Sequence, residues 1–589
     1  MRRLALAVLI VPALAIALGG QTGPPQKRSR DWKRLEASGL TVMGNAGADE
    51  LRRTATSILR FRAAMRSLLP FVRLDPPAPT VAVVFRDDNA MTPFKPRDRG
   101  KPMDMVAAYF APHPDVNYIV LSIGRREFTY QVVFHEYTHL LVNQNISRLP
   151  LWLNEGFADF FSTFDGSEVD RRLIVGRPID RYVGLLVGRA PPVPMNTFID
   201  PASMRDLYRD DLTTARFYAQ SWALVHYLML ADNATHRPAL GAFMSALQNG
   251  DPADQAFRRV FGPDLTTLDA ALNRYLGLMK LPAIQVSAPD LQVTSDATAM
   301  TEADAEQLQG DLQVRTGAFE EADKHLDKAL AIDRQHVQAR LSRARGLVAQ
   351  DRAADALDIL SAPDLMAGDD FARDYLRAEA DLDLRHYDAA ERGYRHAVDQ
   401  RPDFAFGYYG LSLAQLGLGR PEAAGTFTRV LQLSPSPGWY WTRLLDSQRL
   451  GLDHFAISDA TNFVDQSGWT NTSSPYAMYI AAITYLRRNE KDKAAEVLEA
   501  IRSHVAPTSW QADIASFLEG KTTGQALVLK TTLPGPLTEA HAYIGIKAHL
   551  DGDLRSAYQH LEWVRDKGVR SYTEYRLALG ELDRMDRVH

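Results

Sequence analysis

The sequence contains no cysteine, which excludes disulfide bonds and lipid attachment at a cysteine of the mature N-terminus. Basic residues do not outnumber acidic ones, since 67 Lys and Arg stand against 72 Asp and Glu, giving a net charge of −5 at pH 7. Charges of both signs are interspersed along the chain, which is typical of solvated surface. Without a global positive field we expect no nucleic-acid partner.

Long apolar runs are also missing after the first twenty residues. Those residues, "MRRLALAVLIVPALAIALGG", combine a short positive start, an apolar stretch and small residues. This layout predicts a secretory signal peptide over residues 1–20, and the stretch is short for a membrane-spanning helix. We expect an exported protein of the bacterial periplasm or exterior, with no stable membrane insertion after removal of the leader. The alternative is an uncleaved leader that anchors the N-terminus in the membrane.

Residues 30–279 are predicted to form a mixed α/β domain. At 589 residues the chain is too long for one core, and we expect two to four domains. The runs Thr80–Asp87 and Val116–Ser122 are rich in β-branched and aromatic residues and predict strands, with a loop between them. Helical periodicity begins at about Glu127 and returns over Leu151–Phe164 and Ala215–Ala231.

Residues 280–299 loosen into a segment with prolines and small polar residues, which predicts a linker. A 34-residue period then follows through residues 300–589. A small residue recurs at this spacing, and a second small residue follows each one twelve positions later. In the first three units the pairs are Gly310 with Ala322, Ala344 with Ala356, and Ala378 with Ala390.

This 34-residue pattern resembles the tetratricopeptide repeat, in which small residues lie where two antiparallel helices cross. The resemblance covers the C-terminal half of the chain and is degenerate around Gly438–Ser474. It implies an all-α solenoid that binds a substrate or a partner protein. The alternative interpretation is an alanine-rich helical bundle without repeat architecture.

The motif "HEYTH" carries the chemistry of the first domain. Residues four apart share a helix face, so His135 and His139 can direct their imidazoles to one point. Catalytic zinc takes three protein ligands and a water molecule, and Glu136 is placed to act on that water as a general base. Two histidines at this spacing are a weak signal alone. "WLNEGFADFF" follows on a second predicted helix, where Glu155 supplies a third ligand and Asp159 can orient a histidine ring.

These segments resemble the gluzincin metallopeptidases. "HEYTH" matches their HExxH motif, and "WLNEGFA" is similar to the third-ligand segment of aminopeptidase N. "FYAQSWALVHYL" resembles their helix that carries a tyrosine, which corresponds to Tyr218 here. The resemblance implies an α+β gluzincin-type domain, one Zn²⁺ per chain, peptide or protein substrates, and Tyr218 as the donor that stabilises the oxyanion.

One departure bears on specificity. Aminopeptidases of this group carry a G-x-M-E-N strand upstream of the zinc helix, whose glutamate binds the free amino end of the substrate. This chain has no glutamate between Met105 and Ser122. The closer likeness is to exported bacterial proteins of the peptidase MA-like group, which often carry tetratricopeptide repeats.

Two functional hypotheses follow from these motifs. The first is an exported zinc endopeptidase whose repeats position protein substrates; strict aminopeptidase activity is a weaker variant of it. The second is a repeat-based binding scaffold with a catalytically silent peptidase domain. An intact set of ligands together with Glu136 favours the enzyme, because a silent site has no need of the base. Two histidines and a carboxylate also suit divalent metals other than zinc.

Overall fold

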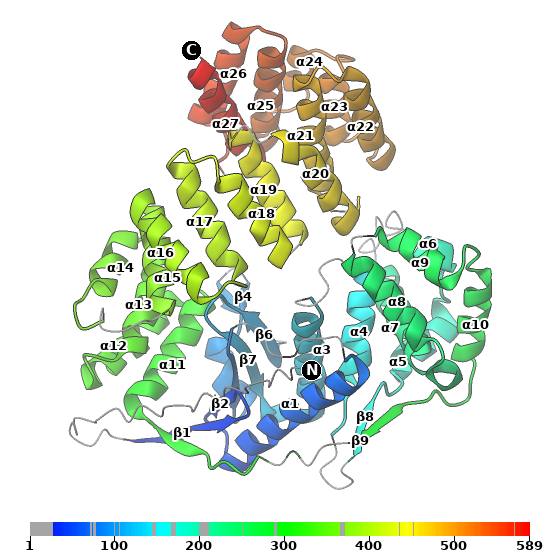
Figure 1. Cartoon of the computed structure of the whole chain (residues 1–589), viewed down its shortest axis with the longest axis vertical. Helices are drawn as coiled ribbons and strands as arrows, with labels where there is room; N and C mark the ends of the chain where they lie inside the picture. The colour runs from blue at the N-terminus through cyan, green and yellow to red at the C-terminus, as the bar shows by residue number, and fades with distance from the viewer. Residues whose placement is uncertain are drawn as a thin grey trace, which may run out of the picture.

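The computed structural model describes residues 28–70, 74, 78–98, 100–104, 106–143, 149–166, 172–199, 211–249, 251–287, 291, 293–365, 371–434, 436–450, 453–469, 471–570 and 572–588. The predicted leader, residues 1–20, lies outside the described residues. A mixed α/β part comes first and an array of helices follows it (Figure 1). Among the helices described, none combines the length and the apolar character that a bilayer span requires.

The strands of the α/β part are β1 (Arg28–Ala37), β2 (Leu40–Gly44), β3 (Thr80–Phe85), β4 (Arg97–Asp98), β5 (Lys101–Pro102), β6 (Ala108–Pro112), β7 (Asn117–Ser122), β8 (Arg172–Val175), β9 (Ile284–Ser287) and β10 (Thr298–Thr301). Its helices are α1 (Ala48–Leu68), α2 (Asp88–Met91), η1 (Thr92–Phe94), η2 (Ile123–Arg125), α3 (Arg126–Asn143), α4 (Leu151–Ser162), α5 (Asp180–Gly184), η3 (Leu185–Arg189), α6 (Met195–Phe198), α7 (Asp211–Ala234), α8 (Arg237–Gln248), α9 (Ala253–Phe261) and α10 (Thr266–Leu276).

Six strands form the main sheet in the order β10-β1-β2-β3-β7-β6. The pairs β2–β3 and β3–β7 are parallel, while β10–β1, β1–β2 and β7–β6 are antiparallel. All six residues of β7 and five of the six in β3 are buried, as expected for central strands covered on both faces. The two predicted strands are thus present. The stretch predicted as a loop, residues 89–104, contains most of α2, η1 and the β4–β5 pair, and β6 follows it.

Helices cover both faces of this sheet. Alternate residues of β3, among them Ala82 and Val84, pack with α1 and α3 into the largest core cluster. Val83 and Phe85 point the other way and pack with Leu308 on the first helix of the array. The helical array is therefore joined to the α/β part through a shared apolar core.

The segment predicted as a linker, residues 280–299, contributes to two of the three sheets, the main sheet and the two-stranded β8–β9 sheet. Strand β9 pairs with β8, and β10 begins inside this segment and pairs with β1. Both paired stretches are short, and prolines and small polar residues flank them in the sequence, which explains why the sequence lacks a strand signal there. The segment is therefore anchored to the α/β part at two places.

The helices of the array are α11 (Glu302–Arg315), α12 (Phe319–Ile332), α13 (Val337–Val348), α14 (Ala353–Leu360), α15 (Phe371–Asp383), α16 (Tyr387–Gln400), α17 (Ala405–Gly417), α18 (Ala423–Leu433), α19 (Pro437–Leu450), α20 (Asp453–Ser467), α21 (Ser474–Arg487), α22 (Lys491–His504), α23 (Trp510–Leu518), α24 (Gly524–Leu529), α25 (Pro534–Leu550), α26 (Leu554–Lys567) and α27 (Thr573–Val588). The coarse prediction of an α+β part followed by an all-α part is confirmed.

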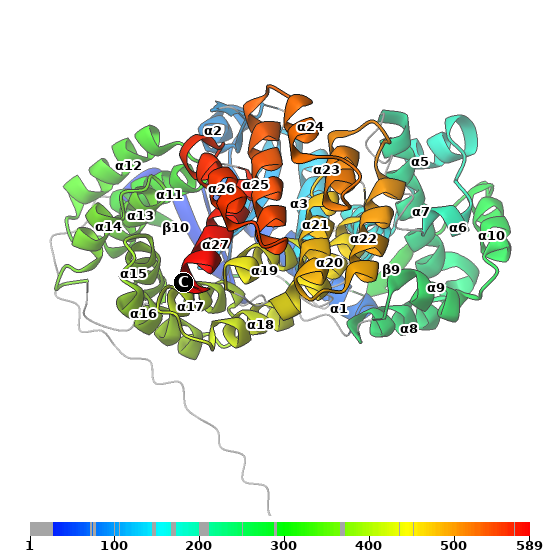
Figure 2. The ribbon, with the colours of Figure 1, turned by 90° about the horizontal axis from the view of Figure 1, so that it is seen from above.

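Small residues lie where neighbouring helices of the array cross. A Cβ atom on Gly310 of α11 would lie 2.7 Å from the side chain of Leu326 on α12, and one on Gly545 of α25 would lie 2.6 Å from the side chain of Leu561 on α26. The array begins beside the sheet, rises along one side of the molecule and passes above the end of the sheet (Figure 1). Seen from above, part of the array, including α21 and α25, lies in front of the region that contains α3 (Figure 2).

Candidate metal centre

Helix α3 places two imidazoles side by side. His135 and His139 are four residues apart, so they project from the same face of the helix. Their Nε2 atoms lie 3.1 Å apart, and their rings stand almost at right angles. Both side chains are about four-fifths buried, with 22% and 19% of their surface exposed. The pair therefore directs two nitrogen atoms to one partly enclosed point.

Helix α4 brings a carboxylate to the same point. The Oε2 atom of Glu155 lies 3.6 Å from Nε2 of His135 and 3.6 Å from Nε2 of His139. Tetrahedral zinc with bonds of about 2.0–2.1 Å holds its ligand atoms roughly 3.3 Å from one another. In the part of the chain that the structure describes, these three residues form the only group of histidine and acidic side chains with metal-ligand spacing.

The second nitrogen of each imidazole faces an oxygen atom. Nδ1 of His135 lies 3.1 Å from Oδ1 of Asp159, and Nδ1 of His139 lies 3.1 Å from Oδ1 of Asn154. Because both oxygens are acceptors, the neutral rings carry their protons on Nδ1 and present Nε2 lone pairs to each other. Two lone pairs and the carboxylate of Glu155 then converge, an arrangement that is favourable only around a cation.

The ionisation of the side chains points the same way. Burial lowers the pKa of His135, but the hydrogen bond to Asp159 and the contact with Glu155 raise it to about 10. Burial raises the pKa of Glu155, but the two imidazoles outweigh it and lower the pKa to about 2. A proton on His135 supplies the missing positive charge to two of the three donors, whereas a metal ion between them contacts all three. The donor set therefore fits a divalent metal, whose binding displaces that proton.

An outer hydrogen bond fixes the position of Asp159. The hydroxyl of Tyr182, on α5, donates to Oδ2 of Asp159 over 3.0 Å, while the other carboxylate oxygen faces His135. Asp159 is buried, with 6% of its surface exposed. Burial and the neighbouring carboxylate raise the pKa of Tyr182, so its hydroxyl keeps the proton that it donates. A chain of contacts therefore runs from α5 through α4 to the imidazole on α3.

Aromatic packing and one glycine set the position of α4. Trp152 is buried and stacks on Phe243 of α8, which fixes the first turn of the helix. Gly156 lies against α7 so closely that a Cβ atom there would be 2.4 Å from the carbonyl oxygen of Ser221. Only a residue without a side chain permits this approach, and it occurs directly beside Glu155.

Tyr218 lies on α7 three residues before Ser221, one turn away on the face that meets α4. Its ring packs on the main core and against Phe217. The predicted oxyanion donor is thus on the helix that packs against the Glu155 turn.

Glu136 differs from the other polar residues of the site. It is partly exposed, and within the described part of the chain its carboxylate has no hydrogen-bond or ion-pair partner. His135, His139, Glu155 and Asp159 are all held by neighbours. The carboxylate next to His135 is therefore available to accept a proton from water.

The structure brings the three predicted ligands and Asp159 together and adds two residues that the sequence reasoning did not assign to the site. Asn154 stands next to Glu155 in the sequence, and this adjacency is the signal that could have placed it at the site. Tyr182 carried no signal, because its contact with Asp159 depends on how α5 returns to α4. His226 on α7 lies outside the site: it is buried and bonded to Tyr275 and to the carbonyl of Gly176.

Comparison with known proteins adds one match. A family described as "protein of unknown function (DUF1570)" matches residues 129–249. The matched segment contains both histidines, Glu155 and Tyr218. No curated protein matches the chain.

Proposed function

We propose that the chain is a zinc-dependent peptidase of the gluzincin type that cleaves peptide bonds inside its substrates. One observation carries the proposal: two imidazole nitrogens and a carboxylate oxygen converge within 3.6 Å, and each imidazole is held from behind by an oxygen acceptor. Beside them stands the carboxylate of Glu136, which has no partner among the described residues. Sequence resemblance to HExxH peptidases and the donor geometry support the same chemistry independently.

His135, His139 and Glu155 would hold the ion. When bound, zinc supplies a Lewis acid that polarises the scissile carbonyl and makes a water molecule acidic enough to attack it near neutral pH. Glu136 accepts the proton of that water and delivers it to the amine that leaves. Tyr218 donates a hydrogen bond to the oxyanion that develops on the substrate, which stabilises the transition state more than the ground state.

Asp159 and Asn154 do not touch the substrate in this mechanism. They hold the two imidazoles in the tautomer that leaves Nε2 available, and Tyr182 holds Asp159. Outer contacts of this kind contribute to metal affinity and to ligand orientation.

The edge of the sheet supports internal cleavage. Strand β6, with the sequence AYFAP, is the outermost strand next to α3 and carries no acidic side chain. A peptidase that requires a free amino end needs an anionic group there to bind it. We therefore assign endopeptidase rather than aminopeptidase specificity.

We assign the helical array the binding of a substrate or partner protein. Its 34-residue period resembles the tetratricopeptide repeat, and the array passes above α3 (Figures 1 and 2). The same array is the basis of the alternative function, a binding scaffold whose first domain is catalytically silent.

The test compares the wild-type chain with Glu136→Gln and Glu155→Ala. Metal content by elemental mass spectrometry is expected to be about one zinc per chain in wild type and Glu136→Gln, and strongly reduced in Glu155→Ala. Cleavage of unstructured proteins and of peptides with blocked amino ends is expected for wild type alone. Undiminished cleavage by Glu136→Gln refutes the mechanism, and a zinc-loaded wild type that cleaves nothing leaves the scaffold as the function.

A further inference from the structure

A cavity of about 540 Å³ lies between the α/β part and the first helices of the array, away from α3 and α4. Tyr118 of the main sheet lines it, together with residues of α11, α13 and the N-terminal end of α15, among them Phe371. A volume of this size is typical of sites for small molecules. The metal centre contributes no residue to it.

Arginine dominates the charged lining. Five arginines and three aspartates line the cavity. The arginines are Arg28, Arg34, Arg315, Arg345 and Arg401, and the aspartates are Asp115, Asp304 and Asp311.

Most of these charges are paired within the protein. Arg315 donates to both oxygens of Asp115 and to Asp311, and Arg345 donates to the same two carboxylates. These two arginines and two aspartates are mostly buried and cancel one another. Outside this network, Arg34 pairs with Glu36, and Asp304 pairs with His336.

Two guanidinium groups remain without a carboxylate. Arg28 donates to the carbonyl of Ala299, and Arg401 donates to the carbonyl of Pro114 while it lies over the ring of Phe371 at 3.7 Å. Within the described residues, neither has an acidic group at ion-pair distance. A guanidinium carries five N–H donors in a fork that matches an oxyanion, so each keeps most of its donors for a ligand.

We propose that this cavity binds a small organic oxyanion through Arg28 and Arg401. Its formal lining charge is positive by two, and an apolar wall that includes Phe371 adjoins the arginines, which suits a ligand with an anionic group and an apolar or ring-shaped body. The shared recognition chemistry is that of a phosphate or a carboxylate group. The site uses no residue of the metal centre and does not depend on peptidase activity.

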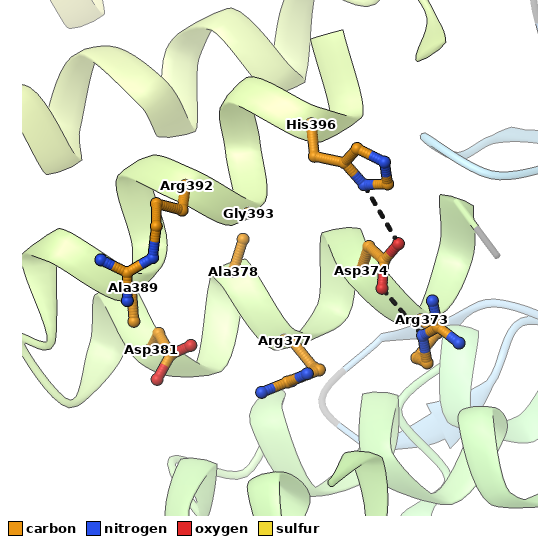
Figure 3. Close-up of a pocket in the computed structure, with 9 residues that line it drawn as sticks. All are labelled: Arg373, Asp374, Arg377, Ala378, Asp381, Ala389, Arg392, Gly393 and His396. Atoms are coloured by element: carbon orange, nitrogen blue, oxygen red, sulfur yellow. Dashed lines mark hydrogen bonds and ion pairs between the residues drawn. The ribbon is translucent and has the colours of Figure 1, made fainter. Parts of the chain in front are cut away.

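In a second cavity, the cationic side chains are neutralised by a carboxylate of the protein itself. It holds about 360 Å³ between α15 and α16. There the carboxylate of Asp374 lies between the guanidinium of Arg373 and the ring of His396 and contacts both (Figure 3). No acidic side chain among the described residues lies at ion-pair distance from Arg28 or Arg401, although Asp115 and Asp403 act on Arg401 from farther away. The larger cavity therefore leaves guanidinium donors for an anion that the chain does not supply.

The experiment is isothermal titration calorimetry of the full chain, freed of metal with a chelator so that the anions cannot bind to a metal ion held by His135, His139 and Glu155. Orthophosphate, pyrophosphate and citrate are titrated separately at low salt. We expect one site per chain for at least one of them, with Arg28→Gln and Arg401→Gln each weakening it by about tenfold, the worth of one charge-assisted hydrogen bond. A preference for pyrophosphate identifies a phosphorylated ligand, and a preference for citrate identifies a carboxylate ligand.

Arg237→Gln is the matched control, because Arg237 also donates to a main-chain carbonyl, that of Met229, but lies outside the cavity. The affinity of the Arg237→Gln variant for the anions should stay within about twofold of the wild-type affinity, since the variant loses no contact to the ligand. Arg28 is exposed on β1, so its variant tests the site even if Arg401→Gln unfolds. The proposal is overturned if none of the three anions binds, or if Arg28→Gln binds them as wild type does.

Discussion

The side-chain oxygen of Asn154 lies 3.1 Å from Nδ1 of His139, so the residue beside one candidate ligand orients another on the neighbouring helix. Helices α3 and α4 are thus coupled twice, through Asn154 to His139 and through Asp159 to His135. The two contacts differ in charge, because His135 faces a carboxylate, which Tyr182 holds in turn, whereas His139 faces a neutral amide oxygen.

We predict that Asn154→Ala weakens zinc binding by about tenfold without unfolding the protein. Loss of the acceptor frees the His139 ring to rotate and to change tautomer, and outer contacts of this kind are typically worth ten- to a hundredfold in metal affinity. Competition with a chromophoric chelator measures the dissociation constant. Asn462→Ala, on α20 of the array, is the control and should leave it unchanged. Equal affinities in Asn154→Ala and wild type would show that the 3.1 Å contact does not orient the ligand.

Gly156→Ala is expected to destabilise the α/β part by about 2 kcal/mol, the usual range for overpacking. The added Cβ atom would lie 2.4 Å from the carbonyl oxygen of Ser221, so α4 and α7 have to separate. Thermal unfolding measures the loss, and zinc affinity should fall with it because Glu155 moves. Gly241→Ala on α8 is the matched control. No atom lies within 4 Å of its added Cβ, so alanine there should stabilise the helix by about 0.5–1 kcal/mol.

Periodicity and motif spacing in the sequence predict the helices that carry the candidate ligands and two strands of the sheet core. Helices α3, α4 and α7 and the buried strands β3 and β7 are predicted from short stretches of sequence, and the i, i+4 rule alone brings His135 and His139 together. Glu155 is predicted as the third ligand because it lies on the next predicted helix, α4, which follows α3 closely in the sequence. Each of these inferences depends on residues close together in the sequence.

Strand β1 shows where local signals end. Its sequence, RSRDWKRLEA, is mostly charged and resembles no typical strand, yet it pairs with β2 on one side and with β10 from nearly 270 positions away on the other. Tyr182 poses the same problem at the site, because its contact with Asp159 is set by tertiary packing. When two strands that pair lie far apart in the sequence, the local pattern of neither strand shows that the other is its partner.

Asp115→Asn is predicted to loosen the junction between the sheet and the array. Asp115 lies in the turn between β6 and β7 and accepts hydrogen bonds from Arg315 and Arg345, which belong to two different helices of the array. Arg315 has 5% of its side chain exposed, so removing one of its two anionic partners leaves a buried charge undercompensated, at a cost of about 3 kcal/mol.

Hydrogen exchange measures this effect locally, as faster exchange of amides in the β6–β7 turn and in α11. Asp551→Asn is the control, since Asp551 pairs with Lys547 at the surface with 59% of its side chain exposed, and such pairs contribute less than about 1 kcal/mol. Unchanged exchange at the junction in Asp115→Asn would mean that the arginine network does not join the two parts.

His226 is predicted to make stability depend on pH between about 6.5 and 4. Burial lowers its pKa to about 4, although the bond to the Gly176 carbonyl opposes this. In the unfolded chain the pKa returns to about 6.5, so the unfolded state binds more protons throughout this window. The free energy of unfolding therefore falls as the pH is lowered, by up to about 3 kcal/mol below pH 4.

The measurement compares metal-free wild type with His226→Gln from pH 7.5 to 4 by urea unfolding, so that other titrating groups cancel in the difference. Glutamine can donate to the Gly176 carbonyl and accept from Tyr275 as the neutral imidazole does, but it takes up no proton. Wild type should lose stability relative to this variant as the pH falls through the window. His236→Gln, at a partly exposed ring, should follow the wild-type curve. Parallel curves for wild type and His226→Gln would show that the buried imidazole is not neutral in the folded protein, and that its contacts with Tyr275 and Gly176 do not hold it so.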